Sequence, residues 1–159
     1  MAREVTILVA DDDAGHALLI EKNLQRTGLN NPLLRFENGQ SLLDFLFQRG
    51  SGPHREPLTP YLLLLDIRMP KVDGVEVLRR VKADSQLRKL PVTMLTTTDD
   101  PREISHCYDL GCGHYIVKPV NYERFSEAVK QFGMFASLVQ IPEIDGCPTP
   151  PTPALQPAF

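Results

Sequence analysis

Four short apolar segments of the chain end directly before side chains that could handle a phosphoryl group. These side chains belong to Asp11, Asp12, Asp66, Thr96 and Lys118. Carboxylates bind Mg²⁺, an ammonium neutralises phosphoryl oxygens, and a hydroxyl donates a hydrogen bond to them. Gathered at one place, the five side chains would form a site for a divalent metal and a phosphoryl group.

The segments that precede these residues are nearly all apolar and only three to six residues long. They are residues 5–10, 61–65, 92–95 and 115–117. Runs of this kind are typical of strands in a parallel sheet that helices cover on both faces. Ligands of such sheets bind outside the carboxyl ends of the strands, where the strand order reverses. We therefore expect the five side chains to meet at one edge of a sheet.

Segments with helical spacing of apolar residues alternate with the strand candidates, which include residues 33–36 as a second strand. Turn and capping residues mark the helix ends: Gly28, Asn38 or Ser41, Gly74, Pro101, Gly111 and Asn121. This alternation predicts an α/β protein, a flavodoxin-like doubly wound (βα)5 sandwich with a parallel sheet in the order 2-1-3-4-5. In that order the first and third strands are neighbours, so Asp11 and Asp12 would lie beside Asp66.

Composition limits the classes of protein that the chain can represent. It has 159 residues and a formal net charge of −3, which gives no electrostatic reason to expect nucleic-acid or membrane binding. No apolar stretch approaches the roughly 20 residues that span a bilayer, and the N-terminus lacks the form of a signal peptide. We expect a cytoplasmic protein with one domain over residues 1–140, followed by a proline-rich, disordered tail over residues 141–159.

The acidic residues are expected to bind Mg²⁺, because carboxylates gathered without a cation repel one another. Asp12 and Asp66 are the predicted direct ligands, together with the backbone carbonyl of Arg68, and Asp11 is expected to act through water. The alternative for a run of acids before a helix is capping, and we favour capping for Asp13.

Asp66 is the candidate nucleophile, because a carboxylate can attack phosphorus and hold the group as an acyl phosphate. Lys118 would supply the neutralising cation, and a cis peptide bond to Pro119 is one hypothesis for how its ammonium could point inward. Thr96 could donate a hydrogen bond to a phosphoryl oxygen, and Tyr115 could move between buried and exposed positions with it. Taken singly, each of these three residues also has a plain structural interpretation.

Four short motifs contain or flank these residues. They are residues 9–12, residues 66–70 with 73–74, residues 90–97 and residues 113–119. With them the chain resembles a response-regulator receiver domain of the CheY-like kind, from about Val5 to Leu138. The resemblance implies that Asp66 is the phosphoacceptor and that Asp11 and Asp12 are the acidic pair that holds Mg²⁺. It also implies that Thr96 and Tyr115 form the switch pair and that Lys118 contacts the phosphoryl group.

Within this family the chain is most similar to small stand-alone regulators that partner phytochrome-type histidine kinases. The features behind this are the long loop over residues 50–60, the turn at residues 95–97 and an extended last helix. The resemblance implies a single-domain two-component response regulator that accepts a phosphoryl group from a histidine kinase onto Asp66. It would not be an enzyme beyond its own phosphotransfer and dephosphorylation.

The last helix carries an apolar stripe that is wider than one packed face needs. The stripe contains Phe125, Val129, Phe132 and Ala136, and Ala128, Phe135 and Val139 widen it. A helix that is apolar around much of its circumference is normally buried by something else, so we expect a homodimer through this helix.

Two other functions fit parts of the same pattern. A pseudo-receiver would share the fold and serve as a phosphate-independent interaction module. A haloacid-dehalogenase-type phosphohydrolase also places a nucleophilic aspartate beside Mg²⁺, but it requires an acid at the position that Arg68 occupies here.

Overall fold

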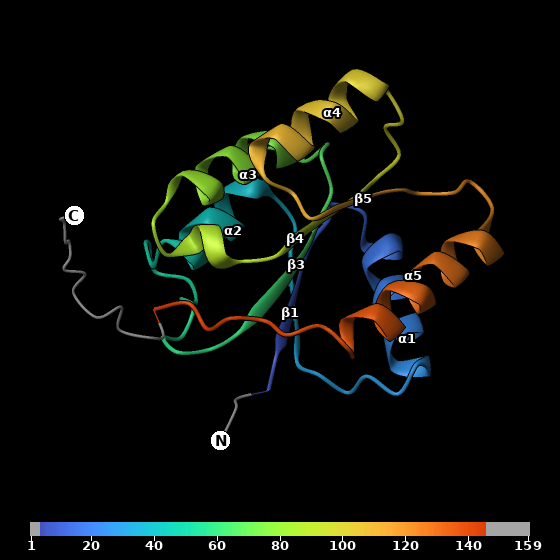
Figure 1. Ribbon diagram of the computed structural model, residues 1–159, viewed down its shortest axis with the longest axis horizontal. Helices are drawn as coiled ribbons and strands as arrows, with labels where there is room; N and C mark the ends of the chain where they lie inside the picture. Colours follow the sequence, from blue (N-terminus) through green and yellow to red (C-terminus); the bar gives the residue numbers. More distant parts are fainter. Residues whose placement is uncertain (1–3, 146–159) are drawn as a thin grey trace, which may run out of the picture.

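Strands and α-helices alternate through the part of the chain that the computed structural model describes, residues 4–145 (Figure 1). The strands are β1 (Thr6–Ala10), β2 (Leu33–Phe36), β3 (Tyr61–Leu65), β4 (Val92–Thr96) and β5 (His114–Val117). The helices are α1 (Ala14–Arg26), α2 (Gly39–Leu46), α3 (Gly74–Ala83), α4 (Pro101–Leu110) and α5 (Tyr122–Ala136). A short 3₁₀ turn, η1 (Leu87–Lys89), lies before β4.

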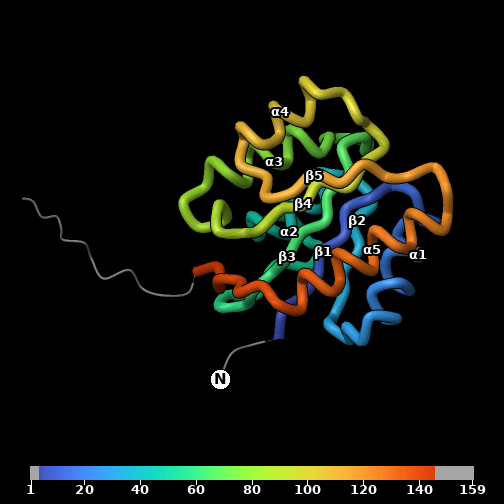
Figure 2. The backbone as a smooth tube through the Cα atoms, turned by 45° about the vertical axis from the view of Figure 1, so that its right-hand side comes forward, coloured from blue at the N-terminus to red at the C-terminus, as the bar shows by residue number. Residues whose placement is uncertain are grey.

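The strands form one parallel sheet in the order β2-β1-β3-β4-β5, which confirms the predicted fold. Helices α1 and α5 cover one face, and α2, α3 and α4 cover the other (Figures 1 and 2). The registers pair Ala10 with Leu65, the last residues of β1 and β3. Because these strands are neighbours that end level with each other, the residues that follow them emerge at the same edge.

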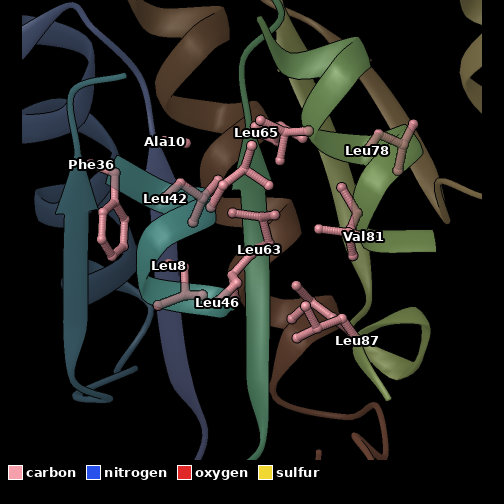
Figure 3. Packing of buried hydrophobic residues seen from close by; sticks show 14 of the residues in the cluster. Leu8, Ala10, Phe36, Leu42, Leu46, Leu63, Leu65, Leu78, Val81 and Leu87 are labelled. Atoms are coloured by element: carbon pink, nitrogen blue, oxygen red, sulfur yellow. The ribbon is translucent and has the colours of Figure 1, made fainter. Parts of the chain in front are cut away.

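The sheet has an apolar cluster on each face, and β3 contributes to both. Leu63 and Leu65 belong to the cluster under α2 and α3, whereas Leu62 and Leu64 belong to the cluster under α1 and α5. Figure 3 shows the first cluster, where strand leucines pack against Leu42 and Leu46 of α2 and against α3. Burial on both faces explains why β3 is apolar at every position rather than at alternate ones.

An aspartate or asparagine side chain caps the N-terminus of each of the five α-helices in residues 4–145. The caps are Asp13, Asn38, Asp73, Asp100 and Asn121. Each accepts a hydrogen bond from a backbone N–H in the first turn, which satisfies a donor that the helix itself leaves free. The capping role predicted for Asp13 is confirmed by its bond from His16 N at 3.1 Å.

Residues 141–145 pack against the domain, although their composition predicted that they belong to the disordered tail. Ile144 is fully buried in the α2–α3 cluster, and its carbonyl accepts a hydrogen bond from Leu58 N at 3.1 Å. Asp145 accepts a hydrogen bond from Arg55 Nη1 at 2.7 Å. Pro142 disfavours a helix here, but the turn at Ile144 and Asp145 can still bury one side chain. Residues 146–159 lie outside the described residues, and the boundary at residue 140 stays a prediction.

None of the helices within residues 4–145 has the length and apolar character that crossing a membrane requires.

Gly74 allows α3 to begin directly against the loop that follows β3. Its N–H donates to Ile67 O at 2.7 Å, and a Cβ at this position would overlap the carbonyl oxygen of Asp66. We therefore expect Gly74→Ala to lower the free energy of unfolding by about 1–3 kcal/mol, the usual effect of overpacking a close contact. Urea unfolding measures this change.

Gly52→Ala is the matched control, because a Cβ at Gly52 meets nothing within 4 Å. Its free energy of unfolding should stay within about 0.5 kcal/mol of the wild type. Equal unfolding midpoints for the two variants would show that the close approach at Gly74 can relax without strain.

Candidate functional site

The sheet holds the first two candidate acids in place through their own backbones. Asp66 N donates to Ala10 O at 3.0 Å, and Asp11 N donates to Phe36 O at 3.1 Å. Both bonds extend the parallel ladder one residue beyond the strands. The positions of Asp11 and Asp66 are therefore set by the sheet rather than by a free loop.

Asp11, Asp12 and Asp66 meet at this edge, as the strand order predicted. Each offers a carboxylate oxygen, and the three oxygens all lie within 4.8 Å of one another. Asp11 and Asp66 are 2% and 8% exposed, whereas Asp12 is exposed to solvent. Burial raises the pKa of Asp11, and its hydrogen bond with Lys118 opposes that rise.

The donor set fits a hard divalent cation. It consists of carboxylate oxygens alone, two of them on buried residues and one open to water, which matches the preference of Mg²⁺ for oxygen ligands with several retained waters. A cation at this point would also favour the ionised form of Asp11 against the effect of burial.

Lys118 reaches the acids from β5 across the end of β4. Its Nζ donates to Asp11 Oδ2 at 2.7 Å and to Asp66 Oδ2 at 3.2 Å, and the residue is 5% exposed. Its backbone N–H donates to Thr96 O at 2.6 Å, which continues the ladder between β4 and β5. Lys118 is therefore not a solvent-facing lysine at a strand end.

The hypothesis of a cis peptide bond between Lys118 and Pro119 is wrong. Residues 4–145 contain no cis peptide bond. The ladder bond to Thr96 already carries Lys118 to the sheet edge, and two carboxylates attract its ammonium there, so the inward direction needs no unusual backbone.

Asp66 presents its two carboxylate oxygens to different partners. Oδ1 accepts the N–H of Ile67 at 2.7 Å, and Oδ2 accepts from Lys118. An open cleft of about 490 Å³ lies beside it, lined by Asp12, Ile67, Arg68, Met69, Asp73 and Glu103. Arg68 is exposed at this cleft, and the role of its carbonyl as a metal ligand stays a prediction.

Thr96 and Tyr115 are linked through one residue of the loop after β4. The hydroxyl of Thr96, which is fully buried, accepts from Thr98 N at 3.5 Å. Tyr115 Oη donates to Thr98 O at 2.8 Å, and burial raises the pKa of Tyr115 to about 12. A displacement of Thr98 would therefore change the hydrogen bonds of both predicted switch residues.

The Thr98 side chain itself is poorly satisfied. Its Oγ1 is the buried side-chain polar atom without a hydrogen-bond partner among residues 4–145. A buried hydroxyl without a partner costs free energy, so this loop arrangement is less stable than one in which the hydroxyl is bonded.

Sequence reasoning missed two residues that contact the site. Arg35 donates to the carbonyl oxygen of Asp11 through Nε at 3.2 Å and Nη2 at 3.0 Å. His16 Nδ1 lies 3.1 Å from Lys118 Nζ. No spacing in the sequence pointed to either residue, because His16 lies 102 residues from Lys118 and Arg35 lies 24 residues from Asp11.

Comparison with known proteins gives a family match over most of the chain. The model of the response regulator receiver domain matches residues 7–130. A solved structure of a response regulator receiver domain from Rhodospirillum rubrum is similar, with 47% identity and a TM-score of 0.83 over 89% of this chain and 99% of that one.

Two further solved structures are similar to this chain. One is the phosphorylated cyanobacterial phytochrome response regulator RcpA, with 30% identity and a TM-score of 0.81 over 88% of this chain and 99% of that one. The other is the Mn²⁺-bound form of the response regulator Rcp1, with 28% identity and a TM-score of 0.78 over the same shares. With the family match, the carboxylate cluster and Lys118 taken together, this chain belongs to the family of response regulator receiver domains and is not a conventional enzyme.

Proposed function

We propose that this chain is a single-domain two-component response regulator that accepts a phosphoryl group on Asp66 from a partner histidine kinase. The observation that carries the proposal is the buried ion pair of Lys118 with Asp66 and Asp11, beside the exposed carboxylate of Asp12. This arrangement puts a nucleophile, a neutralising cation and an oxygen donor set at one sheet edge.

In the transfer, an Asp66 carboxylate oxygen attacks phosphorus of a phosphohistidine. The new bond is P–O, the bond that breaks is P–N, and the electron pair leaves with the imidazole, which takes up a proton. Lys118 neutralises the phosphoryl oxygens as they approach. Asp12, Asp66 and the Arg68 carbonyl would hold Mg²⁺, with Asp11 acting through water, and the bound ion would supply further charge neutralisation.

The signal is a rearrangement of the loop that contains Thr98. A phosphoryl group on Asp66 adds acceptor oxygens that attract the hydroxyl of Thr96 and the ammonium of Lys118. Thr96 then gives up its bond with Thr98, which also binds Tyr115. The buried hydroxyl of Thr98 has no hydrogen-bond partner in this loop conformation, which lowers the free energy needed to leave it. The change reaches the surface formed by α4, β5 and α5.

The proposed partner is a histidine kinase of the phytochrome type, located with this chain in the cytoplasm. Support comes from the likeness to RcpA, a cyanobacterial phytochrome response regulator.

We also propose a homodimer through α5. Three large apolar side chains at its end are exposed: Met134 (62%), Phe135 (41%) and Leu138 (80%). A hollow of about 290 Å³ lies beside Phe135, and its lining also includes Tyr108 and Phe132. An apolar patch of this kind is typical of a protein–protein contact.

Asp66→Asn should abolish phosphorylation. After incubation with acetyl phosphate and Mg²⁺, intact-protein mass spectrometry should detect a phosphoryl adduct on the wild type and on the control Asp109→Asn, whose side chain is exposed on α4. The adduct should be absent from Asp66→Asn and from wild type without Mg²⁺. Equal labelling of Asp66→Asn would identify another nucleophile. No adduct on folded wild type would favour the phosphate-independent interaction module.

Asp12→Asn should weaken Mg²⁺ binding by at least about tenfold. Substitution of residues that only hydrogen-bond to metal ligands already causes a loss of about this size. Isothermal titration of the metal measures it. Asp13→Asn is the matched control, because asparagine caps a helix as well as aspartate does and Asp13 is not a predicted ligand. Similar affinities for the two variants would remove Asp12 from the ligand set.

Wild type should have the mass of two chains by light scattering at high micromolar concentration, and the double variant Met134→Lys/Leu138→Lys should have the mass of one. A lysine at either exposed position would be buried without a charged partner in the dimer, which opposes association, and it leaves the core of the monomer unchanged. The control is Leu18→Lys, which changes an equally apolar residue, 50% exposed, on α1. A wild-type mass of one chain would contradict the proposed dimer.

A further inference from the structure

We propose that His16 is a positioning residue for phosphoryl transfer, because its imidazole accepts the third N–H of the Lys118 ammonium. This inference rests on the proposed function of Asp66 and extends it to a residue outside the acidic cluster. The evidence is the set of contacts around Nζ of Lys118 and the way in which α1 and α5 hold the imidazole ring.

An ammonium has three N–H donors and no acceptor. Nζ of Lys118 lies 2.7 Å from Asp11 Oδ2, 3.2 Å from Asp66 Oδ2 and 3.1 Å from His16 Nδ1. Each donor therefore has its own partner. The three partners come from the ends of β1 and β3 and from the first turn of α1, so the ammonium is fixed in direction as well as in place.

The chemistry of the pair determines the state of the ring. Because the ammonium can only donate, Nδ1 must be the accepting nitrogen, and the neutral ring carries its proton on Nε2. A neutral acceptor holds Lys118 without adding a fourth negative charge to the cluster. A carboxylate in its place would compete with the phosphoryl oxygens for the same ammonium.

One backbone contact and one ring contact place His16. Its backbone N–H donates to the capping Asp13 at 3.1 Å, which fixes the start of α1. Its ring packs against Phe125 of α5, with centroids 5.7 Å apart and planes inclined by 35°. The side chain is 37% exposed, so it lies where the site opens to solvent. A ring held in this way can accept the hydrogen bond of Lys118 from a constant position.

This contact matters most while the phosphoryl group is being transferred to Asp66. The ammonium must then turn from the Asp66 carboxylate to a phosphoryl oxygen, while Asp11 and His16 keep Nζ at the site. Loss of the His16 anchor should slow the reaction by about twofold to tenfold, the effect of one ordinary hydrogen bond.

Two substitutions separate the acceptor from the ring. His16→Phe keeps an aromatic ring against Phe125 but removes the acceptor. His16→Asn removes the ring but can place an amide oxygen near the position of Nδ1. If His16 acts by accepting from Lys118, His16→Phe should be impaired and His16→Asn should restore function. If His16 only packs against α5, the order should be reversed.

The test combines two measurements on the full chain. ¹⁵N NMR of the lysine ammonium groups reports the contact directly, with the Lys118 signal assigned by its loss in Lys118→Arg. The rate of labelling by acetyl phosphate with Mg²⁺ reports its effect on the reaction. We expect wild type and His16→Asn to show a Lys118 signal protected from exchange and to label within about twofold of each other. We expect His16→Phe to lose that protection and to label about twofold to tenfold more slowly.

Several results would overturn the inference. It fails if the wild-type ammonium is not protected, if His16→Phe keeps both protection and rate, or if protection is lost while the rate stays the same. Failure of the proposed function is distinguishable from these results, because wild type would then remain unlabelled while the NMR comparison still reports the contact between His16 and Lys118.

Discussion

The buried ammonium of Lys118 is the interaction on which the carboxyl edge of the sheet depends. Two buried carboxylates, Asp11 and Asp66, lie close enough to share one cation, and without it their like charges would repel each other. The ammonium reaches them only because β5 runs parallel to β4 and Lys118 continues that ladder through Thr96. The charge balance of the site therefore depends on the order of the strands.

The same edge links the site to the outer surface through a short chain of contacts. Thr98 lies between Thr96 and Tyr115 and binds both through its backbone, while its own hydroxyl is buried without a partner. On the other side of the nucleophile, Gly74 brings α3 against the carbonyl of Asp66. One side of the site is thus closely packed, and the other contains a loop with an unmet polar group. A change of charge at Asp66 would act mainly on the second.

Much of the fold could be predicted because its signals are local. Runs that are apolar at every position predicted the central strands, and Asp or Asn before a helical period predicted caps such as Asp13 and Asn121. The convergence of Asp11, Asp12 and Asp66 followed from the predicted strand order. That order could be predicted because alternating strands and helices allow few topologies. The predictions that were wrong used local sequence signals at positions where contacts with distant residues determine the structure. Proline composition did not reveal that Ile144 is buried, and a cis bond was not needed to turn Lys118 inward.

Residue type and short-range spacing were enough to predict which chemical groups follow the strand ends, because these signals need no knowledge of distant contacts. Which of these groups accept hydrogen bonds from the same Lys118 ammonium depends on long-range packing. His16 and Arg35 look like ordinary residues of a helix and a strand, and their contacts with Lys118 and Asp11 join segments that are far apart in the chain. Such contacts depend on how α1, β2 and β5 meet at one edge, and hydrogen bonds form within about 3 Å, a precision that sequence spacing does not carry.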